Sequence, residues 1–393
     1  MNTDIYQNKS FSDQPNAFEP VRPLNLTNGR ALVPAPGDNV MEHVTYLENG
    51  DIIVRMYAPA AKEVRVKSHR ISVWKFDVEM VNRGDGVFEG LLPANLQLNG
   101  DVPLLFEVDG VSVLDPYLPT EFRGNKAVNA IDVYDETTPY VYLRDVPHGS
   151  LSREIYYSES VKQYIRCIVY TPPGYEKGDH EYPVLYLQHG GGENETCWCR
   201  NGKLPYIMDN NIADGLTVPF IVVMNNGMLK APYEKEMNDF DGIEGIITND
   251  CRRYIESKYR VRKDKWGRGI AGLSLGSMQA CYIGMRHPEL FAAIGSFTYI
   301  RCRDRDNTHE GNPHLNILKD YDHFWNSYKL FFRSIGSVEA HLNEFEEDDA
   351  FIARYGIDQN PHYHRMLIPD QTHNWNCWRR AFYEFSQLVF RED

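Results

Sequence analysis

The sequence has no long apolar run, no basic stripe and no signal-peptide pattern, and each absence excludes a class of protein. No apolar stretch approaches the roughly twenty residues that a membrane-spanning helix needs. The formal net charge is −14 and lysine and arginine form no run, which argues against nucleic acid and membrane as partners. The first residues lack a basic start and an apolar stretch, so we expect a cytoplasmic protein.

The sequence also lacks a cysteine framework. Seven cysteines are scattered through 393 residues, an odd count that does not suit paired disulfides. Cys197 and Cys199 are too close for an easy disulfide and have no second pair for zinc. We therefore expect free thiols and no metal site. Hydrophobic residues make up 42% of the chain, which suits a globular protein with one large domain and a smaller one.

The pattern of the sequence changes near residue 150. Residues 1–37 are polar and rich in proline and asparagine, and predict an extended arm. Residues 38–135 contain short alternating strands and turns, which are typical of a β-sandwich. Residues 136–150 are predicted to be a linker. In residues 151–393 strands alternate with helical stretches, which predicts a mostly parallel sheet flanked by helices.

The most informative motif is Gly272-Leu273-Ser274-Leu275-Gly276, a G-x-S-x-G pattern. A strand-like run at 267–271 precedes it and a helix-compatible run at 277–285 follows it. Strand, sharp turn and helix form the context of a nucleophile elbow, in which the glycines allow a tight turn and the serine hydroxyl stands above the sheet. The motif therefore predicts Ser274 as a nucleophile.

A glycine-rich loop upstream of this serine could supply an oxyanion hole. The apolar strand at 182–188 ends in His189-Gly190-Gly191-Gly192, an HGGG-type loop. Backbone N–H groups in such a loop can stabilise negative charge on a substrate oxygen. We predict that the donors are the N–H groups of Leu275 and Gly191.

A serine nucleophile needs a histidine base and a carboxylate that orients it. His373 follows the apolar strand at 366–368 and precedes a helical stretch, and we predict that it is the base. Glu339 follows a strand predicted at 328–335 and is the predicted acid. The acidic residues at 344–349 form what we expect to be a solvated helix face.

Residues from about 150 to 390 resemble the esterase D-like group, also called carbohydrate esterase family 1, which includes feruloyl and acetylxylan esterases. The matching segments are 169–175, 182–190, 271–276 and 372–375. The resemblance implies an α/β-hydrolase fold with Ser274 as nucleophile, His373 as base and Glu339 as acid. Ser277 departs from the pattern, because the family usually has a glycine there.

The first domain is similar to the immunoglobulin-like module of the family 48 carbohydrate-binding type, on the segments 57–61 and 106–110. This resemblance implies a small all-β sandwich in front of the hydrolase. Trp74 and Tyr117 could be sugar platforms, but isolated aromatic residues in a β-sandwich are more often core.

Together these observations predict a serine carboxylic-ester hydrolase that acts through an acyl-enzyme, with no metal or organic cofactor. The expected substrate is a small-molecule or oligosaccharide ester, a feruloyl or acetyl ester of plant-wall oligosaccharides. Trp198, Gln279 and Tyr299 are predicted to line the substrate pocket, and a homodimer is left open.

Two alternatives remain at this point. One is a siderophore esterase of the enterochelin type, for which Arg301, Arg303 and Arg305 could bind an anionic catecholate. The other is a carbohydrate-binding protein with an inactive hydrolase domain.

Overall fold

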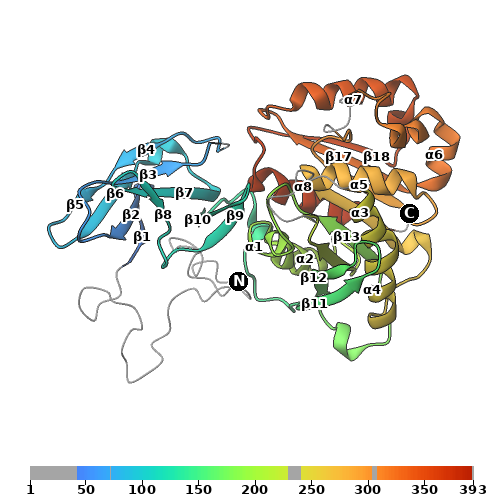
Figure 1. The fold of residues 1–393 in the computed structure, drawn as a ribbon, viewed down its shortest axis with the longest axis horizontal. Helices are drawn as coiled ribbons and strands as arrows, with labels where there is room; N and C mark the ends of the chain where they lie inside the picture. Colours follow the sequence, from blue (N-terminus) through green and yellow to red (C-terminus); the bar gives the residue numbers. More distant parts are fainter. Residues whose placement is uncertain (1–41, 71, 229–239, 303–307, 392–393) are drawn as a thin grey trace. The chain divides into compact units, whose positions relative to one another are not determined.

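The computed structural model describes residues 42–70, 72–228, 240–302 and 308–391 (Figure 1). The chain divides into two compact units, Met1–Pro139 and Tyr140–Asp393. The predicted arm at 1–37 lies outside the described residues. Within the described ranges no helix is both long and apolar enough to cross a membrane.

The first unit is all β, as predicted. It contains two antiparallel sheets, with the strand orders β1-β2-β6-β5 and β4-β3-β7-β10-β9, and β8 pairs with β7. Alternate side chains of these strands, such as Val54 on β2 and Val66 on β3, are fully buried in one shared core. The elements are β1 (Val44–Tyr46), β2 (Ile52–Tyr57), β3 (Val64–Ser68), β4 (Asp77–Glu79), β5 (Val81–Asn82), β6 (Val87–Leu92), η3 (Ala94–Leu96), β7 (Gly100–Val108), β8 (Val111–Val113), β9 (Thr120–Arg123) and β10 (Lys126–Val133).

Trp74 belongs to this core and is no sugar platform. Its side chain is buried among the core residues, and its indole N–H donates to the carbonyl oxygen of Gln97 at 3.1 Å. Tyr117 is half-buried and its ring lies against that of His43, with ring centroids 4.5 Å apart.

The second unit is built on an eight-stranded sheet with the order β11-β12-β14-β13-β15-β16-β17-β18. β11 pairs antiparallel with β12 and β12 with β14, whereas the strands from β14 to β18 pair in parallel. The carboxyl ends of the parallel strands therefore meet at one edge, where the predicted site residues follow them. The strands are β11 (Ser150–Ser158), β12 (Gln163–Thr171), β13 (Val184–Gln188), β14 (Ile221–Asn225), β15 (Arg268–Leu273), β16 (Ala293–Phe297), β17 (Leu330–Gly336) and β18 (Tyr363–Ile368).

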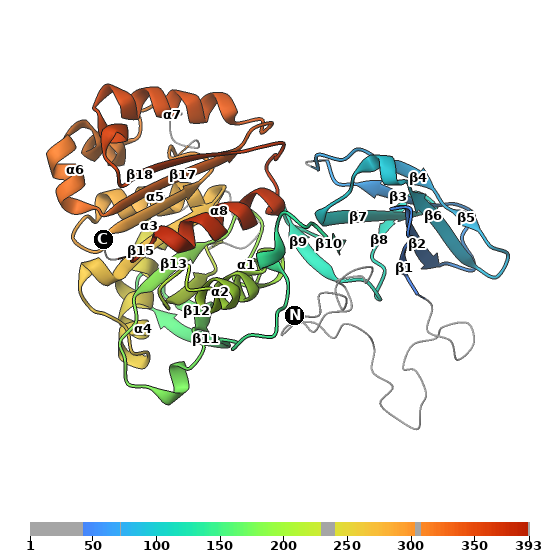
Figure 2. The ribbon, with the colours of Figure 1, turned by 180° about the vertical axis from the view of Figure 1, so that it is seen from behind.

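Helices cover both faces of this sheet (Figure 2). Ile270 and Ile294 face α5, where Gly284 lies so close that a Cβ atom would be 2.9 Å and 3.0 Å from their side chains. The next residue of β16, Gly295, lies under Phe385 of α8. The other face of the sheet therefore packs on α8. The helices are α1 (Cys197–Arg200), α2 (Leu204–Ala213), α3 (Phe240–Gly245), α4 (Arg252–Lys258), α5 (Leu275–Arg286), α6 (Tyr321–Ser327), α7 (Leu342–Arg354) and α8 (Trp375–Leu388), with short turns η4 (Pro139–Val141), η5 (Tyr175–Lys177), η7 (Lys265–Gly267), η8 (Pro313–Lys319) and η9 (Ile357–Gln359).

Two further features belong to the second unit. The predicted linker belongs to the second unit from Tyr140 onward, where the Tyr140 ring stacks on Tyr383 with centroids 3.6 Å apart. The side chain of Asn210 also binds the carbonyl oxygens of Tyr140 and Tyr142, both at 2.9 Å. Between α3 and α4 lies a π-helical turn, η6 (Ile246–Cys251).

All seven cysteines fall within the described ranges. Each of them is buried, and no disulfide joins any two.

Candidate active site

Ser274 occupies a strained turn between β15 and α5. Its φ of 52° and ψ of −120° lie outside the usual regions for a non-glycine residue, as a nucleophile elbow requires. The flanking glycines allow this turn. A Cβ atom on Gly276 would lie 2.5 Å and 2.6 Å from the carbonyl oxygens of His189 and Gln188, and one on Gly272 would collide with the Gly276 carbonyl.

The predicted base and acid converge on this serine. His373 Nε2 lies 2.9 Å from Ser274 Oγ, and His373 Nδ1 lies 2.6 Å from Glu339 Oε1. Glu339 is buried, with its side chain 1% exposed, so it accepts the Nδ1–H and leaves Nε2 to accept the serine O–H. The three residues come from the ends of β15, β17 and β18, and 99 positions separate Ser274 from His373.

The loops after β17 and β18 are joined by backbone contacts that bring Glu339 to His373. The Ser337 N–H donates to Ile368 O at 2.9 Å, and the Val338 N–H donates to Gln371 O at 3.1 Å. Gly336 lies so close to Gln371 that a Cβ atom would collide with its carbonyl oxygen. The pairing of these two loops thus places the acid beside the base.

The glycine loop after β13 approaches the elbow from the other side. A Cβ atom on Gly190 would lie 3.4 Å from the Cβ of Ser274, and one on Gly191 would lie 3.9 Å from the Cβ of Leu275. Leu275 is the first residue of α5, where backbone N–H groups have no partner within the helix. Gly191 and Leu275, whose N–H groups are the predicted oxyanion donors, are therefore neighbouring residues.

His189 holds the start of this loop. Its Nε2 accepts the Gly227 N–H at 2.9 Å, so the proton is on Nδ1, which donates to Gly190 O at 2.8 Å. Burial lowers the pKa of the His189 imidazole, which favours this neutral form.

Two side chains that sequence reasoning did not single out lie against the ring of His373. Trp378 lies edge to face on this ring with centroids 4.9 Å apart, and the His341 ring lies edge to face on it with centroids 5.7 Å apart. His341 also lies against Tyr299, with centroids 5.2 Å apart. Trp378 follows His373 by five residues on α8, which is a usable sequence signal, whereas nothing in the sequence links His341 to this site.

The predicted pocket residues have different surroundings. Trp198 is 1% exposed, and its indole N–H donates to Gln188 O at 3.0 Å. It packs edge to face on Trp375, so its prediction as a substrate contact is wrong and it is a core residue. Gln279 is 3% exposed and donates to Gly227 O at 3.2 Å, whereas Tyr299 lies beside His341.

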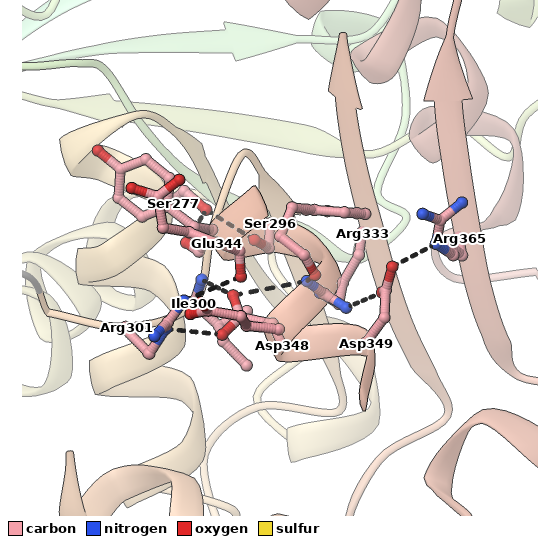
Figure 3. A network of polar contacts seen from close by, with 12 residues as sticks. Ser277, Ser296, Ile300, Arg301, Arg333, Glu344, Asp348, Asp349 and Arg365 are labelled. Atoms are coloured by element: carbon pink, nitrogen blue, oxygen red, sulfur yellow. Dashed lines mark hydrogen bonds and ion pairs between the residues drawn. The ribbon is translucent and has the colours of Figure 1, made fainter. Parts of the chain in front are cut away.

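The acidic helix α7 is not only a solvated face. Asp348 is fully buried and forms ion pairs with Arg301 at 2.8 Å and Arg333 at 3.6 Å (Figure 3). It also accepts the Ile300 N–H at 3.3 Å and lies 3.0 Å from His309 Nε2. Because Arg301 is buried in this network, it does not offer the free cation that we considered for a siderophore. Arg303 and Arg305, the other two arginines of that alternative, lie outside the described residues.

Ser277, the departure from the family pattern, has a structural partner. Its hydroxyl lies 2.8 Å from Ser296 Oγ on β16 and donates to Tyr299 O at 2.9 Å (Figure 3). A glycine could make neither contact. The hydroxyl therefore ties the elbow helix to the segment that carries Tyr299.

This mostly parallel sheet, with an elbow serine, a glycine loop and a histidine after the last strand, defines an α/β-hydrolase fold. The Esterase family model matches residues 158–386. The chain belongs to this family, in agreement with the resemblance seen in its sequence.

Comparisons with individual proteins agree with this assignment. The chain is 36% identical over 237 residues to an endo-1,4-beta-xylanase/feruloyl esterase of Xylanibacter ruminicola. That match covers 54% of this chain and 33% of the relative, so the chain spans about a third of the relative's length. A ferulic acid esterase structure has a TM-score of 0.54 at 24% identity, covering 63% of this chain and 99% of that one. The enterobactin esterase FES of Shigella flexneri has a TM-score of 0.61 at 16% identity, covering 86% of this chain and 92% of that one. Both structural likenesses concern the fold.

Proposed function

We propose that this esterase hydrolyses hydroxycinnamoyl esters, of which feruloyl esters are the type, through an acyl-enzyme on Ser274. The observation that carries the proposal is the position of His373, whose two ring nitrogens lie 2.9 Å from Ser274 Oγ and 2.6 Å from Glu339 Oε1. A serine so paired is activated by its own general base.

The reaction follows from this geometry. His373 Nε2 takes the proton from Ser274 Oγ as the oxygen attacks the ester carbonyl carbon, and Glu339 stabilises the imidazolium. The N–H groups of Leu275 and Gly191 stabilise the oxyanion, each contributing roughly 3 kcal/mol to the transition state. The imidazolium then gives its proton to the leaving alcohol oxygen. In the second half, His373 takes a proton from water as the water oxygen attacks the acyl carbon. The bond from that carbon to Ser274 Oγ then breaks, the imidazolium returns its proton to Oγ, and the acid is released.

The feruloyl group is proposed from the relative that shares 36% identity, whose name includes a feruloyl esterase activity. An acetyl ester of an oligosaccharide is the second candidate acyl group. The catecholate trilactone of a siderophore is the alternative substrate, and Arg301 does not support it, because it is 3% exposed and paired with Asp348. A carbohydrate-binding role of the first unit stays a prediction, and it has lost Trp74 as a platform.

The test is a comparison of four substrates: methyl ferulate, acetylated xylooligosaccharide, p-nitrophenyl acetate and a catecholate trilactone. Each is assayed with the native protein, with Ser274→Ala and with Ser257→Ala, a control at an exposed serine on α4. We expect ferulate release that Ser274→Ala lowers by on the order of a million-fold and that Ser257→Ala leaves unchanged. Full activity of Ser274→Ala would refute the mechanism. Release of acetate alone, or cleavage of a catecholate trilactone alone, would refute the feruloyl assignment.

A further inference from the structure

Glu193 connects two loops of the site that are far apart in the sequence. It directly follows the three glycines after β13, and it is 9% exposed. Its Oε2 accepts the Gly190 N–H at 2.9 Å, and its Oε1 accepts the indole N–H of Trp375 at 3.1 Å. One carboxylate thus binds both Gly190 and Trp375, and Glu193 lies 182 positions before Trp375 in the chain.

Each end of this bridge leads to a reacting group. On one side, Gly190 packs against Ser274 and precedes Gly191, the proposed oxyanion donor. On the other side, Trp375 begins α8 two residues after His373 and is fully buried. Its ring lies edge to face on Trp378, with centroids 5.3 Å apart, and Trp378 lies in the same way on His373.

We propose that Glu193 is a positioning residue, whose carboxylate sets the oxyanion loop and the histidine loop at the correct distance from each other. The inference rests on the proposed roles of Ser274, His373 and Gly191. It deepens them, because it names the contact that holds the two halves of the site together.

The chemistry of the bridge requires a carboxylate. Both of its contacts come from N–H donors, so both ends of the side chain must be acceptors. Glutamine has the same shape but offers one acceptor and one NH₂ group. In Glu193→Gln the NH₂ group therefore faces either Gly190 N–H or Trp375 N–H, and one contact becomes a repulsion between donors.

This requirement gives a double-mutant test. Glu193→Gln should lower kcat for p-nitrophenyl acetate about 10- to 100-fold with KM changed less than about threefold, because a displaced oxyanion donor acts on the transition state. Trp375→Phe keeps a ring but removes the N–H, and should lower kcat about three- to tenfold. In the double variant the glutamine NH₂ no longer meets an N–H, so its kcat should equal or exceed that of Glu193→Gln alone.

Two controls separate this role from stability and from the mechanism. The rates of all variants that keep Ser274 are divided by the active concentration, from end-point labelling with a fluorophosphonate, and those of Ser274→Ala by the total protein concentration. Asp209→Asn changes another buried carboxylate, which accepts from Tyr170 and Gly149 at 2.7 Å and 2.9 Å, and should lower the Tm with kcat unchanged. Ser274→Ala tests the proposed function itself. If this variant stays active, the proposed mechanism is wrong, whatever the result for Glu193.

Three results would overturn the inference while Ser274→Ala is inactive. The first is a kcat of Glu193→Gln within twofold of the native value, whatever its Tm. The second is a double variant whose loss is the product of the two single losses or greater. The third is an unchanged kcat of Trp375→Phe, which is the variant to measure if Glu193→Gln does not fold.

Discussion

The buried carboxylate of Asp348 should be a main source of stability in the second unit, and Asp348→Asn tests this. The side chain is completely buried on α7 between Arg301 and Arg333, which are 3% and 0% exposed. The substitution preserves volume and removes the charge. It leaves two buried guanidinium groups short of a counter-charge, because asparagine can accept hydrogen bonds but carries no charge.

The size of the effect follows from what the two arginines retain. Removing one partner of a buried ion pair typically costs about 3–5 kcal/mol. Arg333 keeps Asp349 at 2.5 Å, and Arg301 keeps Glu347 at 3.0 Å, so we expect the lower end, about 3 kcal/mol. For a unit of this size that corresponds to a Tm lower by about 6–12 °C.

The assay is urea unfolding at pH 7, followed by the intrinsic fluorescence of tryptophan. Glu347→Gln is the matched control, since Glu347 pairs with the same arginine but is 62% exposed. It should cost at most about 1 kcal/mol, because exposed ion pairs contribute little. If Asp348→Asn is within 1 kcal/mol of the native protein, or no worse than Glu347→Gln, the reasoning about buried charge is wrong here.

Three further predictions concern the site. Glu339→Gln should lower kcat about a thousand- to ten-thousand-fold in steady-state assays, because His373 loses the charge that orients it. Glu346→Gln, at an exposed position of α7, should leave kcat unchanged. Equal effects of the two variants would refute the assignment of Glu339 as the acid. Gly276→Ala should lower the free energy of unfolding by about 3 kcal/mol or more in urea, since its Cβ would lie 2.5 Å and 2.6 Å from backbone oxygens. Gly178→Ala should cost much less, because its Cβ would lie 3.6 Å from a side-chain atom. Equal costs would contradict the close packing of the elbow. Burial lowers the pKa of His189, so below pH 6.5 the unfolded chain binds a proton that the folded protein does not, and the free energy of unfolding decreases as the pH falls. His189→Gln should reduce this dependence by up to about 1.4 kcal/mol per pH unit, measured by urea titrations at pH 7 and pH 5. An unchanged dependence would argue against a neutral His189.

The catalytic motif could be predicted because its information is local. The turn at Ser274 needs small residues on both sides, and the two glycines of G-x-S-x-G satisfy that within five residues. The order of strand and helix around it follows from hydrophobic periodicity, which also lies within short windows. Glu339 and His373 were predicted from their place after strands, because parallel strands end at one edge.

Other residues could not be assigned in this way because burial depends on distant partners. Trp198 looks like a pocket residue by its position near the glycine loop, yet α8 supplies Trp375 and Phe382 to cover it. Asp348 lies in a run of acidic residues that is typical of a solvated helix, and only the packing of α7 on β17 turns it toward two arginines.

The sequence by itself determined the elbow, the glycine loop, the alternation of strands and helices and the esterase family, since each of these depends on short-range backbone geometry or on a contiguous motif. The tertiary structure alone decided that Glu193 meets Trp375 and that His341 lies beside His373. These contacts join residues from different loops, and a pairing across 182 positions leaves no periodic or local pattern in the chain.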